Sequence, residues 1–277
     1  MRAWVGTQDQ GGLIAADQPA ISVLDHGFTV ADGVFETLKV LDGVPFALTR
    51  HLNRLRRSTQ AMALPAPDDE WVRGAIHAVL GGNPTAGLHR LRVTYTAGIG
   101  PLGSDRGHAA PTLAVALSSA VPWPPTTTVA TVPWVRNERS ALSGVKSTSY
   151  AENVLALRLA HQQGASEALF ADTRGRLSEG TGSNVFVVLG GELLTPTLGS
   201  GCLAGITREL VLEWARATEQ DLPMDVLQEA EEVFLTSSTR DVHPVSRIDQ
   251  RDLGAPGPVT AEVSATFRER SARNSDP

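Results

Sequence analysis

A proline-rich break divides the chain into two parts, and each part mixes strand-like with helix-like patterns. Residues 121–126 read Val-Pro-Trp-Pro-Pro-Thr, so this segment has no periodicity and is stiffened by three prolines, as in a semi-rigid connector. A chain of 277 residues can form one large domain or two smaller ones. We therefore predict a small N-terminal domain at residues 1–120, a connector at 121–126 and a larger domain at 127–277.

The spacing of apolar residues predicts the secondary structure on both sides of the connector. Strands are predicted at residues 34–40, 89–96, 112–117, 128–132, 167–172 and 184–189, and helices at 49–63, 68–80, 150–163 and 206–218. These helices and strands alternate only weakly, which favours an α+β fold over a doubly wound parallel sheet. The polar residues 268–277 are expected to fray.

Composition and motifs exclude several classes of protein. The net charge of −6 gives no basic surface for nucleic acid or anionic membranes, and no apolar run is long enough to span a bilayer. Cys202 is the only cysteine and residues 1–12 show no leader pattern, so we expect a cytoplasmic protein. The seven histidines lack metal-ligand spacing, and no metal site is predicted. The run GIGPLG at residues 98–103 matches a dinucleotide fingerprint, but the residues after it do not open the helix that such a site requires.

Lysine occurs only twice, as Lys39 and Lys146, among 24 lysines and arginines. A lysine amine can lose its proton when buried and attack a carbonyl carbon, which a guanidinium cannot do. Taken alone, Lys146 would more often be an ordinary surface residue. Its neighbours change that interpretation, because the run GVKSTSYAEN at residues 144–153 places it just before a predicted helix with Tyr150 in the first turn.

This run resembles the lysine segment of fold-type IV enzymes that use pyridoxal 5'-phosphate (PLP), the family of class IV aminotransferases and aminodeoxychorismate lyase. The resemblance implies that Lys146 carries the cofactor as a Schiff base and that Tyr150 hydrogen-bonds the phenolic oxygen of PLP. The run LSEGTGSNVF at residues 177–186 is similar to the family's glutamate motif, which implies that Glu179 pairs with the pyridine nitrogen and that Ser183 and Asn184 contact the cofactor. A carboxylate there keeps the ring protonated and able to accept electrons when a substrate Cα loses a proton. Without the other motifs, Glu179 could equally be an exposed acid in a turn.

Three further segments resemble the family's phosphate-binding elements. The run GITR at residues 205–208 opens a predicted helix and offers backbone N–H groups and a hydroxyl to an anion. Residues 51–55 match an H-x-x-R-L segment, and residues 236–239 form a hydroxyl-rich turn. The resemblance implies phosphate contacts from Arg54, Ile206, Thr207 and Ser238, and Gly205 is a further predicted cofactor-binding residue. Taken alone, Arg54 would be a solvated arginine on a helix face.

The run DHGFTVADGVFET at residues 25–37 also resembles the family's N-terminal signature, and all the matches follow the family's order between residues 25 and 245. The resemblance implies an architecture like that of D-amino-acid aminotransferases. This architecture has a small N-terminal α/β domain, a larger C-terminal mixed α/β domain and the cofactor between them. It also implies a homodimer in which the partner contributes loops to each site.

Positions that differ among the branches of the family bear on the substrate. Val30 stands where branched-chain aminotransferases commonly have a tyrosine, and Phe35 stands where D-amino-acid enzymes have a carboxylate-binding tyrosine, so neither position offers a hydrogen-bond donor. The partner-loop arginine and histidine of D-amino-acid enzymes correspond to Arg106 and His108, and Thr37 is compatible with the lyase. The substrate-binding residues predicted from the resemblance are Val30, Phe35, Thr37, Arg106, His108, Thr239 and Arg240.

The resemblance implies an aminotransferase that moves an amino group from an amino acid, with D-amino acids favoured, to a 2-keto acid in a ping-pong cycle. Lys146 would be the catalytic residue that moves a proton at the substrate Cα. The same residues would serve an aminodeoxychorismate lyase that releases 4-aminobenzoate and pyruvate, and a PLP-binding protein without turnover is a second alternative. The motifs do not separate these three functions.

Overall fold

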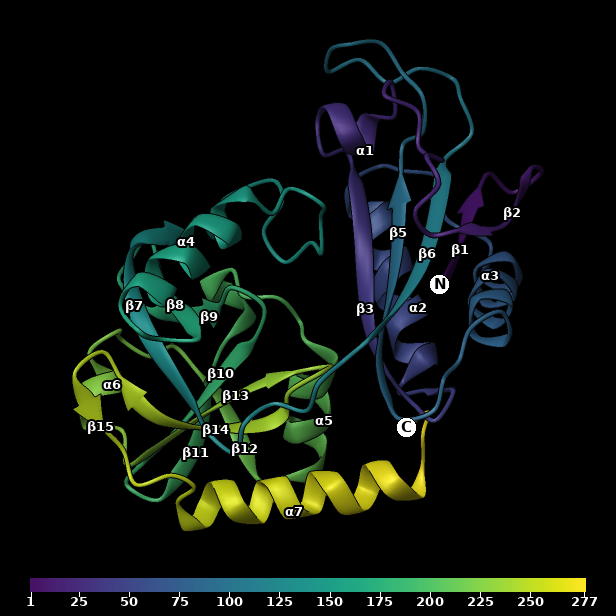
Figure 1. Ribbon diagram of the computed structural model, residues 1–277. Helices are drawn as coiled ribbons and strands as arrows, with labels where there is room; N and C mark the ends of the chain where they lie inside the picture. Colours follow the sequence, from purple (N-terminus) through teal and green to yellow (C-terminus); the bar gives the residue numbers. More distant parts are fainter. The chain divides into compact units, whose positions relative to one another are not determined.

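The computed structural model describes residues 1–277 and divides into two compact units, whose elements are labelled in Figure 1. Unit 1 comprises Met1–Pro122, Val145–Ser149 and Ser275–Pro277, and unit 2 comprises Trp123–Gly144 and Tyr150–Asn274. The first change of unit falls inside the proline-rich segment. The short segment that carries the candidate lysine belongs to unit 1, although its place in the sequence lies in the second predicted domain. The domain division itself stays a prediction.

Unit 1 is built on a six-stranded sheet in which every neighbouring pair is antiparallel. The strand order is β2-β1-β6-β5-β3-β4. The N-terminal hairpin formed by β1 and β2 therefore joins the sheet where β1 pairs with β6, the last of the six strands in sequence. The strands are β1 (Arg2–Gly6), β2 (Gly11–Ala15), β3 (Gly33–Leu41), β4 (Val44–Pro45), β5 (Leu88–Thr96) and β6 (Thr112–Ser119). The three strands predicted in this part of the chain correspond to β3, β5 and β6.

The two faces of this sheet differ in chemistry because side chains alternate along each strand. Val34 and Leu38 of β3 belong to the hydrophobic core, and Glu36 has the same phase, so a carboxylate is directed to the core side. Phe35 has the opposite phase, and the guanidinium of Arg92 on β5 lies 3.7 Å from the centre of its ring. One face of β3 therefore places an acid among apolar side chains, and the other places an aromatic ring beside a cation.

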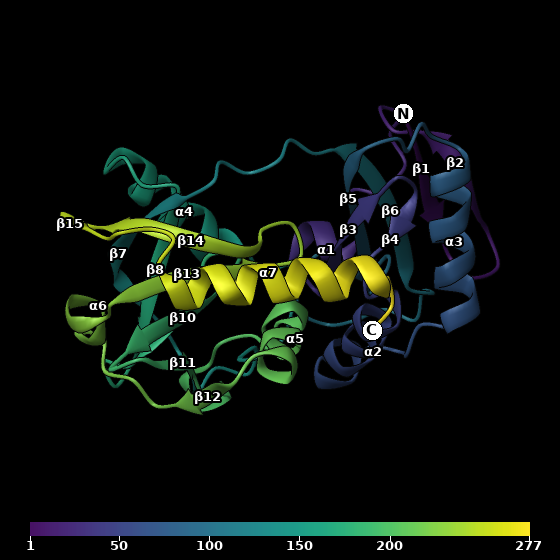
Figure 2. The same ribbon diagram turned by 90° about the horizontal axis from the view of Figure 1, so that it is seen from below.

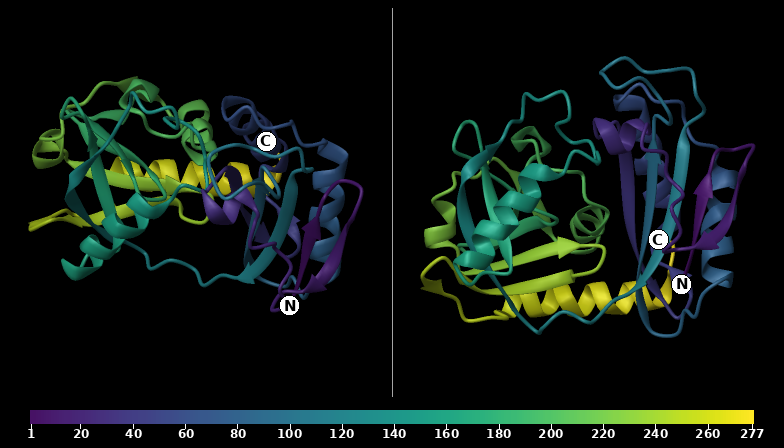
Figure 3. Two further views of the ribbon diagram at one scale, coloured as in Figure 1. Left: turned by 90° about the horizontal axis from the view of Figure 1, so that it is seen from above. Right: turned by 45° about the horizontal axis from the view of Figure 1, so that its top comes forward.

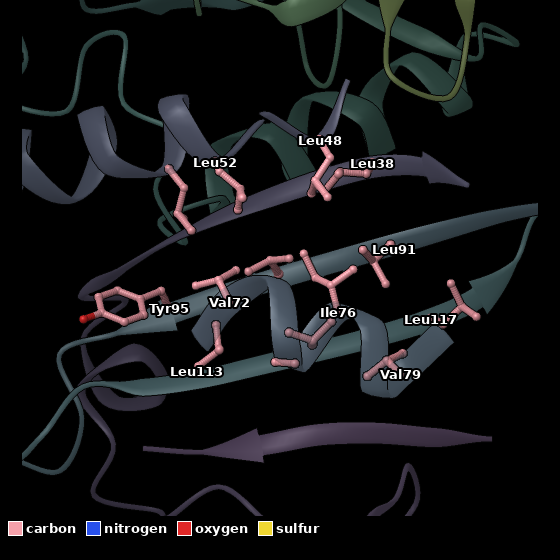
Figure 4. Close-up of a cluster of buried hydrophobic side chains, with 14 of the residues drawn as sticks. Leu38, Leu48, Leu52, Val72, Ile76, Val79, Leu91, Tyr95, Leu113 and Leu117 are labelled. Carbon is pink, nitrogen blue, oxygen red and sulfur yellow. The ribbon is translucent and has the colours of Figure 1, made fainter. Parts of the chain in front are cut away.

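Two helices cover the core side of the sheet. Helix α2 (Leu48–Ala61) packs on β3, and α3 (Asp69–Gly81) packs on β1, β2 and β6, while the short α1 (His26–Thr29) precedes β3. Figure 4 shows the apolar side chains between these helices and the strands. They include Leu38, Leu48, Leu52, Val72, Ile76, Val79, Leu91, Tyr95, Leu113 and Leu117. Each buried leucine or isoleucine contributes roughly 1.5–3 kcal/mol, so this packing fixes α2 against the strand that carries the buried acid.

The end of the chain completes the N-terminus of α2. Ala47 precedes this helix with a φ of 54° and has no capping side chain. Asp276 supplies the missing cap. Its Oδ1 accepts a hydrogen bond from the Thr49 N–H at 2.8 Å, and its Oδ2 accepts one from the Thr49 hydroxyl at 2.6 Å. The expectation that residues 268–277 fray is therefore wrong, because residues 268–273 are helical and residues 275–277 are hydrogen-bonded to the start of α2.

Unit 2 contains a nine-stranded sheet that mixes parallel and antiparallel pairs, in the order β12-β11-β10-β13-β14-β7-β8-β9 with β15 beside β14. The pairs β11–β12, β14–β7 and β7–β8 are parallel. The strands are β7 (Thr127–Arg136), β8 (Glu167–Asp172), β9 (Leu177–Gly180), β10 (Asn184–Leu189), β11 (Glu192–Pro196), β12 (Ala217–Gln220), β13 (Glu232–Ser237), β14 (Asp241–Ile248) and β15 (Arg251–Asp252). These sheets and the helices around them confirm the α+β class.

Helices pack on this sheet at three places. Helix α4 packs on β7 and β8 (Figure 3), α5 packs on β12 and β13, and α7 runs beside α5 against β13 and β14 (Figure 2). The helices of unit 2 are α4 (Ala151–Gln162), α5 (Ile206–Trp214), α6 (Val226–Glu229) and α7 (Pro258–Arg273), with a 3-10 turn η1 (Leu198–Ser200). The helix predicted at 206–218 is too long, because residues 217–220 pair with β11 as a strand. None of the helices is both long and apolar enough to cross a membrane.

Candidate active site

Lys146 is held at the edge of the sheet of unit 1. The segment Val145–Ser149 lies antiparallel to the start of β3, where the Lys146 carbonyl accepts a hydrogen bond from the Phe35 N–H at 2.9 Å and the Thr148 N–H donates to the Gly33 carbonyl at 2.8 Å. The Lys146 Nζ lies 4.4 Å from the centre of the Phe35 ring. Lys146 is half-buried, and its side chain starts from a backbone that the sheet fixes.

A buried ion pair occupies the core side of the same strand. Arg54 of α2 donates from Nε to Glu36 Oε1 at 2.8 Å and from Nη2 to Glu36 Oε2 at 2.6 Å, and His51 Nδ1 lies 2.6 Å from that Oε2. Burial raises the pKa of Glu36, but the charge and hydrogen bonds of Arg54, together with His51, outweigh it and lower this pKa to about 2. Burial lowers the pKa of His51, so the imidazole is neutral and its Nδ1–H donates to the carboxylate. The predicted phosphate residue thus belongs to a buried, hydrogen-bonded cluster.

The predicted substrate residues near the start of unit 1 differ in their environments. Phe35 is buried, with Arg92 and Lys146 both close to its ring. Thr37 has the same phase along β3 as Phe35 and is half-buried. Val30, directly after α1, is 47% exposed. The sheet therefore places Lys146, Phe35 and Thr37 along one side of β3.

Arg106 and His108 lie in the exposed loop that follows β5. Arg106 donates from Nε and Nη2 to the two carboxylate oxygens of Asp32 at 2.6 Å each, and from Nη1 and Nη2 to the carbonyls of Ala63 and Met62 at 2.9 Å. The hydrogen bonds to Asp32 raise the pKa of Arg106. A guanidinium that was expected to bind a substrate carboxylate thus binds a carboxylate of its own unit, and its role toward substrate stays a prediction.

In unit 2, Glu179 on β9 is held by two groups that the motifs did not indicate. Its Oε1 accepts a hydrogen bond from Arg136 Nε at 3.1 Å, and its Oε2 accepts one from the Leu203 N–H at 2.9 Å. Arg136 is itself positioned on the Phe170 ring, with 4.1 Å from the guanidinium carbon to the ring centre. A cation and a backbone donor therefore hold the carboxylate in one orientation.

A second buried acid, Glu167 on β8, fixes the segment after Glu179. It accepts hydrogen bonds from the Thr181 N–H at 3.0 Å and the Ser183 hydroxyl at 3.1 Å, and it also pairs with the Thr181 hydroxyl. The Thr181 carbonyl accepts a hydrogen bond from the Tyr150 hydroxyl at 2.7 Å. Burial raises the pKa of Tyr150, so this phenol keeps its proton at neutral pH. Glu167 could have been suspected from the sequence only as a buried charge at the start of a strand whose next four residues are apolar.

The hydroxyl-rich turn after β13 contains Ser238 and Thr239, both half-buried, and leads to Arg240. The Arg240 guanidinium lies 3.7 Å from the centre of a Trp123 ring, and its Nη2 lies 3.7 Å from Glu167 Oε2. Only 5% of this side chain is exposed. Side chains of unit 2 therefore enclose Arg240, and its contact with substrate stays a prediction.

The start of α5 has the features of an anion site. Gly205 precedes this nine-residue helix without a capping side chain, so the helix presents the N–H groups of Ile206 and Thr207 at its positive end. A Cβ at position 205 would lie 2.0 Å from Asn184 Oδ1, so the approach requires glycine. Thr236 stands opposite Asn184 across β10 and β13, and its buried hydroxyl has no hydrogen-bond partner. An uncapped helix start near an orphaned hydroxyl fits a group with many acceptor oxygens, such as the phosphate of PLP.

Comparison with known proteins defines the class. Residues 33–248 match the family described as amino-transferase class IV, so this chain belongs to that family. A putative branched-chain-amino-acid aminotransferase of Methanocaldococcus jannaschii is 32% identical over 275 residues, with 94% of each chain covered. A D-alanine aminotransferase of Listeria innocua is 29% identical, with 94% of each chain covered. An aminodeoxychorismate lyase of Bacillus subtilis is 28% identical, with 94% of this chain and 92% of the lyase covered.

Solved structures show the same fold. A fold IV-transaminase of Curtobacterium pusillum is 29% identical with a TM-score of 0.85, covering 96% of this chain and 99% of that one. A hypothetical aminotransferase of Mycobacterium tuberculosis in its PLP-bound form is 28% identical with a TM-score of 0.85, covering 99% and 100%. The fold is therefore that of the fold-type IV enzymes, as the resemblance implied. Family membership and the PLP-bound structure imply PLP as the cofactor, with small amino and keto acids as substrates.

Proposed function

We propose that this protein is a PLP-dependent aminotransferase that transfers an amino group from an amino acid, with D-amino acids favoured, to a 2-keto acid in a ping-pong cycle. The observation that carries the proposal is the placement of Lys146, whose backbone is bonded to β3 and whose amine lies on the Phe35 ring. Lys146 would hold the cofactor covalently through Nζ and act as the catalytic residue.

The residues of the chain have distinct tasks in this reaction. When bound, PLP supplies an aldehyde that takes up the amino group and a ring that draws electrons from the substrate Cα. Once the amino donor has displaced Lys146 from the cofactor, the freed Nζ would move a proton from the Cα of the donor to the cofactor carbon C4', and it would move a proton back to the Cα of the acceptor in the second half of the cycle. Glu179, oriented by Arg136, keeps the ring nitrogen protonated. Tyr150 retains its proton, and its hydroxyl would have to turn from the Thr181 carbonyl to donate a hydrogen bond to the phenolic oxygen.

The phosphate would be bound by the start of α5, by the hydroxyl turn and by Arg54. The helix start offers N–H groups and a positive dipole end, and the buried Thr236 hydroxyl opposite Asn184, which has no hydrogen-bond partner, supports a polar ligand at this place. Arg54 supplies the charge that a doubly negative phosphate needs. The proposed cofactor residues are Arg54, Lys146, Tyr150, Glu179, Ser183, Asn184, Gly205, Ile206, Thr207 and Ser238.

The preference for D-amino acids is supported by the D-alanine aminotransferase relative and by Val30, which stands where branched-chain aminotransferases commonly have a tyrosine. Phe35 lacks the hydroxyl with which D-amino-acid enzymes bind the substrate carboxylate. The substrate carboxylate must then be bound by arginine or histidine, and Arg106 already holds Asp32. A substrate that has to compete with this ion pair is bound weakly. We therefore expect D-alanine and D-glutamate to act as donors with modest affinity, and Arg106→Ala to raise KM for them while sparing amines that lack a carboxylate.

A lyase is the second candidate function. The aminodeoxychorismate lyase of Bacillus subtilis matches the chain over nearly its whole length, and Thr37 shares the side of β3 on which Phe35 lies. Because a lyase uses the same lysine and cofactor, the products decide between the two functions. A PLP-binding protein without turnover is the remaining alternative.

A half-reaction assay tests the proposal. The PLP-loaded protein is mixed with single D- and L-amino acids without keto acid, and the visible absorbance of the cofactor is followed. We expect D-alanine or D-glutamate to bleach this absorbance and pyruvate or 2-oxoglutarate to restore it. If no amino acid changes the spectrum and aminodeoxychorismate is converted rapidly to pyruvate and 4-aminobenzoate, the lyase is correct. If neither happens, the protein binds PLP without turnover.

We also propose a homodimer, which the exposed apolar side chains of unit 1 support. Val23, Phe28 and Leu102 are each more than 70% exposed, and such groups favour burial against another surface. Light scattering should give twice the 29.4 kDa mass of the chain, and a monomer at micromolar concentration would contradict this proposal. A cytoplasmic location stays a prediction.

A further inference from the structure

Glu36 occupies a position where a charge is costly. It has the same phase on β3 as the core residues Val34 and Leu38, and only 1% of it is exposed. A carboxylate in such a place is tolerated when strong donors satisfy it, and the pair formed with Arg54 would be no better for stability than well-packed apolar residues of similar size. Stability alone therefore does not account for an acid at this position.

The geometry of the cluster restricts Arg54. Glu36 binds the edge of the guanidinium formed by Nε and Nη2, which fixes both the plane and the rotation of the group. His51 donates to the same carboxylate and so fixes Glu36 in turn. The donors of Arg54 outside this ion pair are the two N–H groups of Nη1 and the second one of Nη2, at the far end of the side chain.

We propose that Glu36, supported by His51, is a positioning residue that holds the Arg54 guanidinium in one orientation for the phosphate of the cofactor. This inference rests on the proposed function, in which Arg54 contacts that phosphate. An unrestrained arginine loses side-chain entropy when it binds, whereas Arg54 has already lost it in the folded protein. The interaction is thus preorganised.

The opposite role would give the opposite result. A carboxylate beside an arginine lowers its net attraction for a phosphate, so if Glu36 only competed for Arg54, removing its charge would tighten PLP binding. If Glu36 positions Arg54, removing its charge weakens PLP binding. In both cases the binding of pyridoxal, which lacks the phosphate, should stay unchanged when the Glu36 charge is removed.

The test measures equilibrium binding of PLP and of pyridoxal to the cofactor-free protein by absorbance and fluorescence. We expect Glu36→Gln to weaken PLP by about tenfold and to leave pyridoxal unchanged, which is the size of effect given by one misplaced charge-assisted pair. Glu36→Asp keeps the charge but is one methylene shorter, so it folds more readily and should weaken PLP by about threefold. Glu232→Gln is the matched control, because Glu232 is a buried acid of unit 2 that accepts hydrogen bonds from the Val259 and Thr260 N–H groups. This variant should leave the ratio of the PLP affinity to the pyridoxal affinity unchanged.

Arg54 variants separate this inference from the proposed function. Arg54→Ala should lower the ratio of PLP to pyridoxal affinity, and adding Glu36→Gln to it should have no further effect. Positioning by Glu36 is wrong, and the proposed function stands, if Arg54→Ala lowers the ratio but neither Glu36 variant does. The same conclusion follows if Glu36→Gln tightens PLP binding or weakens the binding of both ligands equally. If Arg54→Ala leaves the ratio unchanged, the phosphate contact fails and the inference with it. If the wild-type protein binds neither ligand, the proposed function itself is wrong.

Discussion

Glu179 is a residue whose chemical role can be tested apart from its fold. A glutamine at this position keeps a carbonyl oxygen that can accept a hydrogen bond from Leu203 or Arg136. A neutral amide cannot keep a ring nitrogen protonated, so we expect Glu179→Gln to retain PLP and to lose turnover by about a hundredfold or more. The measurement is the single-turnover rate with D-alanine beside the PLP content of the purified protein. Glu192→Gln, on the exposed start of β11, serves as the control. Turnover close to wild type in Glu179→Gln would show that the carboxylate does not act on the ring.

The buried cluster around Glu36 also sets how stability depends on pH. The pKa of Glu36 is about 2 in the folded protein against an ordinary 4.5, so between these values the unfolded chain takes up a proton that the native state does not. The pKa of His51 lies below its ordinary 6.5, so His51 acts in the same direction from pH 6.5 downward. The stability contributed by the cluster is complete above pH 6.5 and is lost on acidification, with roughly 3 kcal/mol from Glu36.

Urea unfolding at a series of pH values checks this expectation. The wild-type free energy of unfolding should fall steeply between pH 4.5 and pH 2. Glu36→Gln should have a lower free energy of unfolding at neutral pH and should lack the part of this fall that comes from Glu36. Equal slopes for the two proteins would mean that Glu36 titrates normally.

The motifs pointed to the residues proposed for the chemistry more readily than to the residues that hold them. Lys146 and Glu179 lie within sequence motifs, whereas Arg136 can hold Glu179 only once the fold brings β7 close to β9. Glu167 likewise depends on the loop after β9. Glu36 did leave a local signal, because a charged residue in the buried phase of an alternating strand requires a partner.

At the scale of elements, α2 shows why a helix start can escape sequence patterns. No capping residue precedes Leu48 in the chain, and the cap comes instead from Asp276. We expect Asp276→Ala to lower the free energy of unfolding by about 1 kcal/mol, as for other N-cap aspartates. Asp68→Ala, which removes the local cap of α3, is the matched control and should cost about the same. A change of less than about 0.3 kcal/mol in Asp276→Ala, with a normal loss in the control, would show that the tail does not cap α2 in solution.

Element types were predicted well where the periodic pattern was long, as at β3, β5 and α3. The errors occurred where tertiary contacts override local preference. Residues 217–220 continue a helical pattern but pair with β11 in the structure. The polar composition of residues 268–273 conceals the end of α7, because a helix with one covered side needs few apolar positions.

At the scale of the whole molecule, the α+β class followed from the weak alternation of helices and strands, but the strand orders did not. In unit 1 the N-terminal hairpin pairs with β6, and in unit 2 β14 pairs with β7, so both sheets join strands that are distant in sequence. Single-sequence patterns carry no information on such pairings. The same limit applies to Val145–Ser149, which pairs with β3 of unit 1 although the chain on both sides of it belongs to unit 2.

Lys146 is the proposed cofactor lysine, and the chain contains only one other lysine. Lys39 also lies beside an aromatic ring, with its Nζ 5.1 Å from the centre of the Phe46 ring, so it is the one alternative attachment site for the cofactor. The direct measurement is borohydride reduction of the PLP-loaded protein followed by peptide mapping. We predict that the label is found on the peptide that contains Lys146 and is absent from Lys146→Ala. A label on Lys39, or no labelled lysine in a protein that still holds PLP, would contradict the account.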